Sequence, residues 1–395
     1  MTQAQTWTGR RLEVEVGAVA HGGHCVARAD GRVVFVRHAL PGERVVVEVT
    51  EDKGGSFCRA DAVEVLEPSP DRVAAPCPLA HPGGCGGCDW QHASAEAQRS
   101  LKATVVAEQL RRLAGLDLDV EVEALPGGLG DWRTRLRMVV DGKGRAGFRA
   151  HRSHKVVPAR RCTIAYPDLV EEVAQQHWTR GAELDLTADS MGQMHIVERP
   201  QRGRPRTVSG DGVAVERAGG REWRVDAHGF WQVHPEAADL YAEIVAEWAA
   251  APLGGTAWDL YGGAGLFAAV LAEQVGPDGH VLVVESSRGA VADGRDNLRD
   301  LPQVRFKAGL VEETTLTGRP DVVVLDPPRK GAGKAVVDAI AACEPSRVIY
   351  VACDPAALAR DVAGFAAHGY RLERLRAFDA FPMTHHVECI GLLAR

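Results

Sequence analysis

The feature that most constrains the fold is an alternation of apolar runs and amphipathic segments that begins after Trp231. Residues 234–250 carry apolar side chains at helical spacing, and the runs TAWDLY, HVLVVE, DVVVLDPP and RVIYVACDP follow with helix-length intervals between them. Near-continuous apolar strands that alternate with helices are typical of a parallel sheet covered on both faces. We therefore predict an α/β Rossmann-like domain over residues 230–395.

The N-terminal part has a different pattern. Residues 10–67 contain LEVEVGAVA, GRVVFVRHAL, ERVVVEVTED and FCRADAVEVLE, which are β-rich runs separated by Gly, Pro and Asp. Such short runs predict a small OB-like β-barrel over residues 1–70. Residues 71–229 mix strand and turn signals with a helix from about Ala95 to Leu113, and they predict a central α+β domain.

The net charge of −7 argues against a generally basic nucleic-acid binder. Between Trp132 and Arg161, however, ten Arg or Lys residues stand against one acid, Asp141, and this stripe fits either RNA contact along one face or an ordinary solvated surface. No run approaches the roughly 18 apolar residues of a membrane span, and MTQAQTWTGRRLEVEV lacks the apolar stretch of a signal peptide. We expect a cytoplasmic monomer without a membrane partner.

Three of the nine cysteines, Cys77, Cys85 and Cys88, fall within twelve residues of one another. In a cytoplasmic protein such a cluster indicates a metal site more often than a disulfide. Only one CxxC pair is present and His92 lies close by, so these residues alone leave zinc and an iron–sulfur cluster equally open.

The segment DLYGGAGLF, residues 259–267, ends a predicted strand in a glycine-rich turn that opens a helix. Glycines in such a turn let the backbone approach a nucleotide or nucleoside, although many such turns only make room for helix packing. Glu285 closes the next strand, where an acid can accept hydrogen bonds from both ribose hydroxyls. Because the full GxGxxG spacing is lacking, we expect an adenosine-type ligand rather than a dinucleotide.

Three further residues follow or begin strands. Asp326 opens DPPRKG at the carboxyl end of a predicted parallel strand, where open α/β sheets bind ligands. Cys353, in YVACDPAALARD, precedes a helix whose N-terminus is expected to lower the thiol pKa and favour a nucleophilic thiolate. Glu388, in THHVECIGLL, stands among apolar residues, where a carboxylate is costly unless it is paired or functional. A strand-ending turn and a small core cysteine are the plainer explanations of the first two, and His385 and His386 are open to roles as bases or metal ligands.

In this order, the glycine-rich turn, DPPRKG, VACDPAALARD and HHVE resemble the RNA uracil-5-methyltransferase family. CGGC at 85–88 fits the same family, and the N-terminal residues look like a TRAM domain, a small RNA-binding barrel. The resemblance spans nearly the whole chain, with CDPAALARD and HVE as its most specific parts. It implies that S-adenosyl-L-methionine (SAM) is used to methylate carbon 5 of a uridine in RNA through a covalent Cys–uracil adduct.

The resemblance also implies residue roles. Cys353 matches the family's nucleophile and Glu388 matches its general base. The residues that match its methyl-donor contacts are Gln232, Tyr261, Glu285 and Asp326. The residues that match its four [4Fe–4S] ligands are Cys77, Cys85, Cys88 and Cys162, and spacing alone would not have found Cys162. WRTRLRM and GFR at 147–149 match its RNA-facing region.

The sequence departs from the family at the donor site, where the turn reads GGAG, Leu266 replaces a polar residue of some members, and the acidic contact near Ala308–Gly309 is not recognisable. Members with both a TRAM-like domain and the cysteine cluster are often large-subunit ribosomal RNA enzymes, so we expect 23S ribosomal RNA as the substrate, with tRNA as the alternative. Two other classes stay open, a non-catalytic RNA-binding protein with a methyltransferase fold and a methyltransferase for proteins or small molecules. We expect the cluster to be structural or to position RNA.

Overall fold

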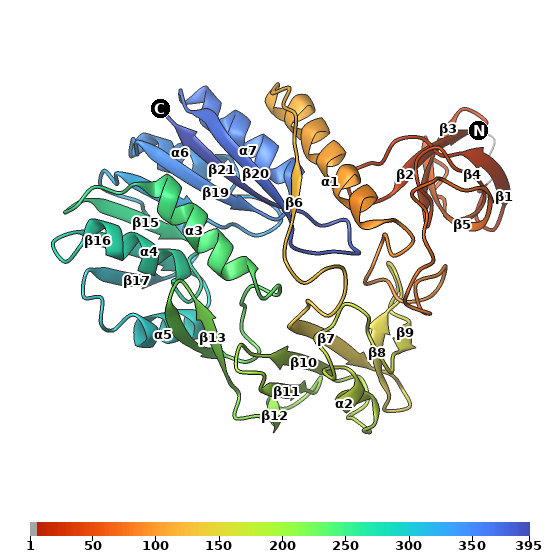
Figure 1. Ribbon diagram of the computed structural model, residues 1–395, viewed down its shortest axis with the longest axis horizontal. Coiled ribbons are helices and arrows are strands. Elements are labelled where there is room, and N and C mark those ends of the chain that lie inside the picture. Colours follow the sequence, from red (N-terminus) through yellow and green to blue (C-terminus); the bar gives the residue numbers. More distant parts are fainter. Residues whose placement is uncertain (1–5) are drawn as a thin grey trace.

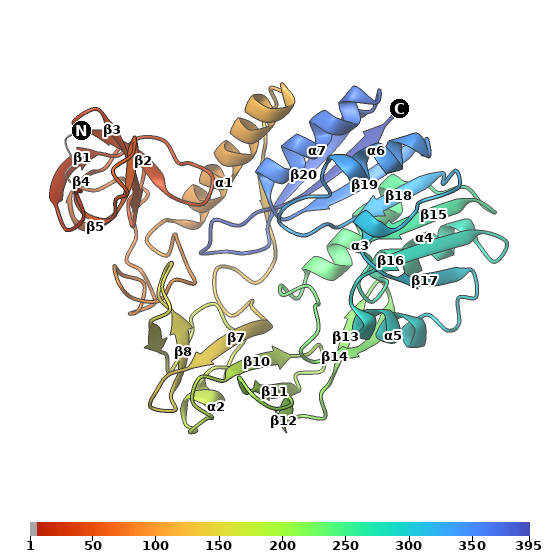
Figure 2. The same cartoon turned by 180° about the vertical axis from the view of Figure 1, so that it is seen from behind.

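The computed structural model describes residues 6–395 and arranges them as three lobes (Figures 1 and 2). The N-terminal lobe, called the β-domain here, is a five-stranded sheet of order β1-β4-β5-β3-β2. Its strands are β1 (Arg11–Glu15), β2 (Cys25–Ala29), β3 (Arg32–Arg37), β4 (Arg44–Glu51) and β5 (Phe57–Glu67). The sheet curls until the chain after β1 meets β2, where Gly17 N–H donates to Val26 C=O over 2.7 Å. A Cβ on Gly17 would lie 2.9 Å from that oxygen, so the closure requires glycine.

The central lobe is a six-stranded sheet of order β12-β11-β10-β7-β8-β9. Its elements are β7 (Arg135–Val140), β8 (Ala146–Arg149), β9 (Val156–Pro158), α2 (Glu171–Ala174), β10 (Glu183–Ala188), β11 (Met194–Arg199) and β12 (Arg206–Ser209). Residues 77–92, which carry three of the clustered cysteines, contain no helix or strand. They are called the cysteine loop here.

The third lobe is built on an eight-stranded sheet of order β17-β16-β15-β18-β19-β21-β20-β6. Its strands are β6 (Val122–Ala124), β15 (Thr256–Leu260), β16 (His280–Glu285), β17 (Val304–Ala308), β18 (Val322–Leu325), β19 (Arg347–Ala352), β20 (Arg371–Asp379) and β21 (Glu388–Ala394). The strands from β17 to β19 are parallel, and β21 is antiparallel to both β19 and β20. The predicted α/β Rossmann-like domain is confirmed.

Helices cover both faces of this sheet (Figure 1). One face packs on α3 (Ala237–Ala249), α4 (Leu266–Val275) and the hairpin β13 (Val213–Ala218)–β14 (Arg221–Asp226), which also contacts α5 (Arg288–Asn297). The other face packs on α1 (Ala95–Gln109), α6 (Lys334–Ala342) and α7 (Pro355–Ala367), with the short 3-10 helix η2 (Val311–Glu313) beside α6. The buried strands between these layers, such as VVVL of β18, have no solvated face, which explains their continuous apolar sequence.

The helix expected from about Ala95 to Leu113 is present as α1, continued by one π-helical turn, η1 (Leu110–Ala114), that ends at Gly115. Ser94 caps its N-terminus by accepting from Ala97 N–H. After this helix, β6 adds to the large sheet in parallel with β20. Residues 95–124 therefore pack with the α/β lobe although they precede the central sheet in the sequence.

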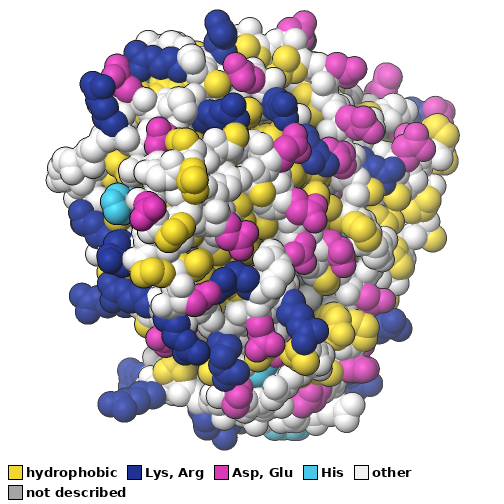
Figure 3. Space-filling model, turned by 60° about the vertical axis from the view of Figure 1, so that its left-hand side comes forward, with side chains coloured by type: hydrophobic (Ala, Val, Ile, Leu, Met, Phe, Trp, Pro, Cys, Tyr) yellow, Lys and Arg dark blue, Asp and Glu magenta, His cyan; other side chains and the backbone are white. Residues whose placement is uncertain are grey.

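The surface charge is unevenly spread. On the face shown in Figure 3, Lys and Arg side chains gather along the left margin, and Asp and Glu are more frequent at the upper right. Within residues 6–395, no helix has the length and apolar character needed to cross a membrane.

Candidate active site

Five strand ends of the α/β lobe meet at one edge of the sheet. Ala352 of β19 is paired with Cys389 of β21, and this register places Cys353 beside Glu388. The carboxyl ends of β15, β16 and β18 lie next to them. Together they form a pocket of about 750 Å³ whose walls include all six residues predicted to be catalytic or to contact the donor. These are Gln232, Tyr261, Glu285, Asp326, Cys353 and Glu388.

The glycine-rich turn forms the floor of this pocket. A Cβ on Gly262 would lie 2.8 Å from Asp259 Oδ2, an oxygen that already accepts from Ala268 N–H over 2.9 Å. Glu285 Oε2 accepts from Gly263 N–H over 3.1 Å, so the acid is anchored to the turn. Tyr261 has a φ of +61°, and its buried hydroxyl has no hydrogen-bond partner. The turn thus presents to a ligand its glycine backbone, the Glu285 carboxylate and the Tyr261 hydroxyl, which has no hydrogen-bond partner.

Burial is the main cause of the pKa shifts at these strand ends, which are called the catalytic edge here. It raises the pKa of Glu388 well above its ordinary value, and the neighbouring Asp326 carboxylate raises it further. Burial likewise raises the pKa of Asp326, with a contribution from Glu285. Glu388 Oε1 is buried and lacks a hydrogen-bond partner. Both acids are therefore strong proton acceptors once they are ionised.

The expectation that the helix N-terminus lowers the pKa of Cys353 is wrong for the ligand-free protein. Burial raises the pKa of this thiol to about 12, and the carboxylates of Glu388 and Asp326 add to the effect. The N-terminus of α7 is already occupied, because Asp354 accepts from Ala357 N–H over 2.8 Å. Burial, together with the carboxylates of Glu388, Asp326 and Asp354, thus outweighs the helix dipole at Cys353.

Basic side chains line the other side of Cys353. His385 Nδ1 lies 2.6 Å from Asp89 Oδ2 of the cysteine loop, and Arg329 Nη2 lies 3.2 Å from His386 Nε2. Burial, together with His385 and Arg329, lowers the pKa of His386 to about 3.

Within residues 6–395, no group of three or more Cys, His, Asp or Glu side chains is close enough together to hold a metal ion. A metal role for the two histidines therefore has no support.

The four cysteines predicted as cluster ligands nevertheless lie within electrostatic reach of one another. Burial raises the pKa of Cys85 to about 11 and that of Cys88 to about 12, and Cys162 contributes to both shifts. Cys77 contributes to the shift of Cys85. His92 is not among the charged neighbours that shift the pKa of Cys85, Cys88 or Cys162. The grouping is therefore thiol-only, and zinc ligation through His92 has no support.

Donors that suit thiolates surround this cysteine group. Gly87 N–H donates to Cys85 Sγ over 3.4 Å, and burial raises the pKa of Cys162 while the amides of Ile164 and Ala165 partly offset that rise. The buried guanidinium of Arg133 interacts with three of the sulfurs. Cationic and N–H donors stabilise sulfur anions, so the chemistry of the site fits thiolate ligands. The metal ion itself is not shown by the geometry.

Several pocket residues were missed by the sequence analysis. Phe230 lies at the pocket wall with 72% of its side chain exposed. Lys330 Nζ donates to Glu312 Oε1 over 2.8 Å, which places an acid in the pocket four positions after Ala308. FWQ and RKG could have drawn attention to Phe230 and Lys330, but exposure is not visible in a sequence. Glu312 follows a strand and a loop, and no motif marks it.

Only some of the Lys and Arg side chains of the basic stripe, residues 132–161, are exposed at the surface. Arg135 is buried and bonded to Glu216 over 2.7 Å, and Arg133 is covered by the cysteine group. Arg137 pairs with Asp185. The exposed Lys and Arg residues of the stripe are Arg137, Lys143, Arg145, Arg149, Arg152, Lys155, Arg160 and Arg161.

Comparisons with known proteins identify both ends of the chain. A family described as TRAM domain matches residues 5–63, and one described as tRNA (Uracil-5-)-methyltransferase matches residues 316–395. Two uncharacterized RNA methyltransferases, from Streptomyces avermitilis and Streptomyces coelicolor, are each 47% identical to the chain. The alignments cover 98% of this chain in both cases, and 98% and 93% of the respective relatives. A Corynebacterium efficiens relative of the same description is 42% identical, over 98% of this chain and 95% of its own.

Among solved structures, the chain resembles the Pyrococcus abyssi tRNA (uracil-54, C5)-methyltransferase in complex with S-adenosyl-L-homocysteine. The TM-score is 0.72 at 21% identity, and the superposition covers 97% of this chain and 100% of that one. At this identity the likeness bears on the fold alone. The two structures share one architecture along almost their whole lengths.

Proposed function

The chain belongs to the RNA uracil-5-methyltransferase family and carries a TRAM domain, and we propose that it uses SAM to methylate carbon 5 of a uridine through a covalent bond to Cys353. The observation that carries this proposal is the pairing of strand ends that sets Cys353 beside Glu388 at the wall of the 750 Å³ pocket. A nucleophile and a base at one wall are what an addition–elimination reaction needs.

The pocket fits the methyl donor by shape and charge. Gly263, which lines the pocket with open space where a Cβ would lie, and the Glu285 carboxylate anchored to it suit the ribose of a nucleoside. The carboxylates of Asp326 and Glu388 face the same space and would attract a cation. SAM supplies an electrophilic methyl group on a positively charged sulfur. The residues that would hold it are Gln232, Tyr261, Glu285 and Asp326.

Covalent catalysis by Cys353 overcomes the weak nucleophilicity of uracil carbon 5. Cys353 Sγ adds to carbon 6, and the electron pair displaced from the ring double bond makes carbon 5 nucleophilic enough to take the methyl group, with S-adenosylhomocysteine as the leaving group. Glu388 then removes the proton that remains on carbon 5. The electron pair of that C–H bond re-forms the double bond as the bond from Cys353 to carbon 6 breaks, so the thiolate is released and the proton stays on Glu388.

The raised pKa values are consistent with this order of events. In the ligand-free protein the neighbouring carboxylates hold Cys353 in its thiol form. A cation in the pocket favours ionised Asp326 and Glu388, and it also favours the Cys353 thiolate. The nucleophile therefore becomes reactive when the donor site is filled, and the free protein is protected from unproductive alkylation.

The RNA is proposed to contact the β-domain around Phe57 and Arg59. Phe35 of β3 and Phe57 of β5 form an edge-to-face pair with ring centroids 5.6 Å apart, and Phe57 is 42% exposed. Arg59 lies over the Phe57 ring at 5.3 Å and also lines a cavity of about 580 Å³ together with Arg152 and Lys155 of the central lobe. Exposed aromatic rings with flanking cations are suited to single-stranded nucleic acid, which offers stacking faces and phosphates.

The proposed substrate is 23S ribosomal RNA, and tRNA is the alternative. The support is the combination of a TRAM domain with the cysteine group in one chain. A specific uridine must leave its stack to reach the pocket, which favours a loop or another single-stranded region.

A [4Fe–4S] cluster is proposed for Cys77, Cys85, Cys88 and Cys162. The support is a thiol-only donor set with Arg133 and peptide N–H groups directed at the sulfurs. The cluster would fasten the cysteine loop to the central lobe and supply no step of the methyl transfer. Asp89 and Trp90, next to the last cysteine of the loop, both donate N–H to Met383 C=O, so this fastening would also support the segment that leads to Glu388.

The proposal is tested with purified protein, SAM carrying a labelled methyl group, and separated ribosomal RNA and tRNA from a strain that lacks the gene. We expect 5-methyluridine at one position of 23S ribosomal RNA, and no product with Cys353→Ala. Label in tRNA alone would establish the alternative substrate. Label that survives ribonuclease and remains on protein would contradict RNA methylation.

A further inference from the structure

One turn of the β-domain reaches the catalytic edge. His21 Nε2 donates to Asp354 Oδ2 over 2.9 Å, and Asp354 follows Cys353 directly. Gly23 C=O accepts from the Trp90 indole N–H over 3.1 Å, and a Cβ on Gly23 would lie 2.6 Å from His385 Cβ. With a φ of +81°, Gly23 adopts a conformation that also requires glycine. The turn is therefore fitted closely against both segments that flank the catalytic pair.

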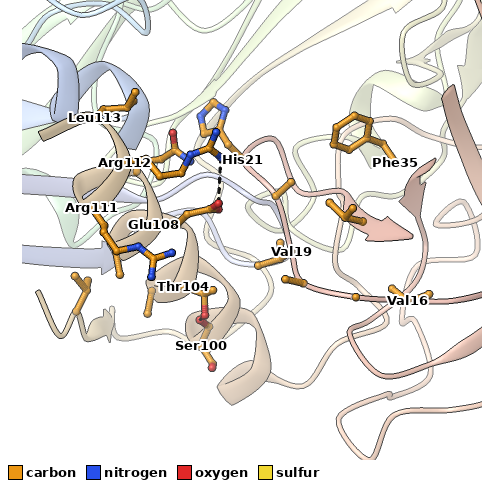
Figure 4. A pocket seen from close by; sticks show the side chains of 18 of the residues that line it. Val16, Val19, His21, Phe35, Ser100, Thr104, Glu108, Arg111, Arg112 and Leu113 are labelled. Atoms are coloured by element: carbon orange, nitrogen blue, oxygen red, sulfur yellow. Dashed lines mark hydrogen bonds and ion pairs between the residues drawn. The ribbon is translucent and has the colours of Figure 1, made fainter. Parts of the chain in front are cut away.

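Beyond this turn, Ala97, Leu101 and Val105 of α1 pack on the core of the β-domain. Beside that contact, a groove of about 1410 Å³ lies between the β-domain and α1, with Val16 and Phe35 on one wall and Ser100, Thr104 and Glu108 on the other (Figure 4). Among the described residues, His21–Asp354 is the single hydrogen bond between the β-domain and residues 230–395. The groove carries acids as well as arginines, and Arg112 is paired with Glu108, so it is no clear track for RNA.

The turn also lines a small cavity of about 70 Å³ that borders Cys353, as the larger pocket at the strand ends does. Its walls come from three regions of the molecule. The β-domain contributes His21, Gly22 and Gly23, the cysteine loop contributes Trp90, and the α/β lobe contributes Cys353 and His385. The nucleophile is thus screened from solvent on this side by the β-domain.

We propose that the turn at residues 20–24 of the β-domain is a positioning element of the catalytic centre, in which His21 fixes Asp354, and with it the strand end that carries Cys353. This rests on the proposed function, because it concerns the rate of the same methyl transfer. The β-domain then has two separable tasks, RNA contact through Phe57 and Arg59 and alignment of the nucleophile through His21.

The positioning effect depends on the Asp354 carboxylate, which accepts two hydrogen bonds. Asp354 Oδ1 accepts from Ala357 N–H and caps α7, while Oδ2 accepts from His21. With both oxygens engaged, the side chain has one rotamer and the backbone after Cys353 is fixed. Loss of the His21 bond leaves one oxygen free, and the thiol gains freedom relative to carbon 6. Misplacement of a reacting atom by about 1 Å can cost on the order of 100-fold in rate.

The experiment compares full-length wild type, His21→Ala, His21→Gln and the matched control Arg11→Ala, which breaks an exposed β-domain ion pair with Glu48. Single-turnover methyl transfer is measured at saturating RNA, and RNA affinity is measured separately. We expect His21→Ala to lower the rate roughly 10- to 100-fold with unchanged RNA affinity. His21→Gln should recover most of the rate, because its amide can donate to Asp354. Arg11→Ala should match wild type.

A second readout does not depend on activity. The rate at which iodoacetamide modifies Cys353 is followed by peptide mass spectrometry, with buried Cys343 as the internal control. His21→Ala should raise the modification rate of Cys353 and not that of Cys343. Wild-type rates at both readouts would overturn the inference, as would a defect confined to RNA affinity. If wild type forms no 5-methyluridine but the modification rate still rises, the proposed function fails while the positioning contact stands.

Discussion

Cys353 at the strand ends and Cys162 in the cysteine group are both half-buried thiols with a raised pKa, but the charges of their neighbours differ. Cys353 lies beside Glu388 and Asp326, which raise its pKa further than burial alone does. Burial raises the pKa of Cys162 as well, but the amides of Ile164 and Ala165 and the Arg133 guanidinium oppose that rise. Both thiols thus have a raised pKa, but carboxylates add to the rise at Cys353, whereas N–H and guanidinium groups reduce it at Cys162.

This difference suits the cysteines of the two regions to different roles, nucleophile and metal ligand. A thiol held by carboxylates stays inert until a cation enters, which suits a nucleophile that must wait for its donor. Thiols that are surrounded by N–H and guanidinium donors suit permanent ligands of a metal cluster. The two regions are joined through Asp89, whose carboxylate binds His385.

The strongest test of the comparison exchanges one sulfur in each region for oxygen. Cys162→Ser should lose nearly all iron and the brown colour of anaerobically purified protein, because a cluster needs all its thiolates. Cys353→Ser should keep the iron and lose methyl transfer. Iron content and 5-methyluridine formation measure the two effects. Stoichiometric zinc without iron in the wild type would contradict the cluster.

The donor-binding part of the catalytic edge is tested by Glu285→Ala. The lost charge-assisted hydrogen bond to ribose should weaken SAM binding by roughly 1.5–3 kcal/mol, or about ten- to a hundred-fold in Kd. Calorimetry gives the affinity, and circular dichroism checks that the fold is retained. Iron content should not change. An unchanged Kd would exclude the donor from the crevice between the glycine-rich turn and Glu285.

The influence of charge on Cys353 is tested by a matched pair of ligands, SAM and S-adenosylhomocysteine, which differ in the positive sulfur and its methyl group. The pKa of Cys353 is about 12 in the ligand-free protein, so thiolate forms only as pH rises towards that value. A cation lowers the pKa and moves alkylation to lower pH. We expect about three- to tenfold faster alkylation of Cys353 with the cationic ligand at pH 8.5. Equal rates would remove the electrostatic explanation.

The smallest expected effect comes from Asp326→Asn without ligand. The charged carboxylate raises the pKa of Cys353, so its removal should speed alkylation about twofold to fivefold at pH 9. At pH 5.5 the effect should vanish, because burial raises the pKa of Asp326 and the wild-type acid is then neutral. A similar acceleration at both pH values would indicate a change in access rather than in charge.

The sequence predicted the α/β lobe well because its signal is local. Continuous apolar strands such as VVVL and the turn after Asp259 determine buried parallel strands and a ligand-binding edge. The β-domain was equally readable, since short alternating runs reflect its two faces. The family relationship drawn from these motifs is confirmed by the relatives and the matched families.

Long-range placement was not predictable. Nothing in VEA at 122–124 shows that β6 joins the large sheet beside β20, or that His21 would meet Asp354 across 333 positions of sequence. The expected pKa of Cys353 was wrong for the same reason, because the burial of the thiol and the carboxylates of Glu388 and Asp326 depend on how other strands pack beside it. The individual site roles remain predictions, which the experiments above and below address.

The central claim is that Cys353 attacks carbon 6 and Glu388 removes the proton from carbon 5. The most direct measurement is a denaturing gel of labelled substrate RNA incubated with SAM and Glu388→Gln protein. Methyl transfer should occur once, and elimination should stall because the proton has no base, so methylated RNA stays bonded to Cys353 and migrates as a protein–RNA band. The double variant Cys353→Ala, Glu388→Gln should give no band. Turnover by Glu388→Gln at near the wild-type rate, or a band that persists in the double variant, would contradict the account.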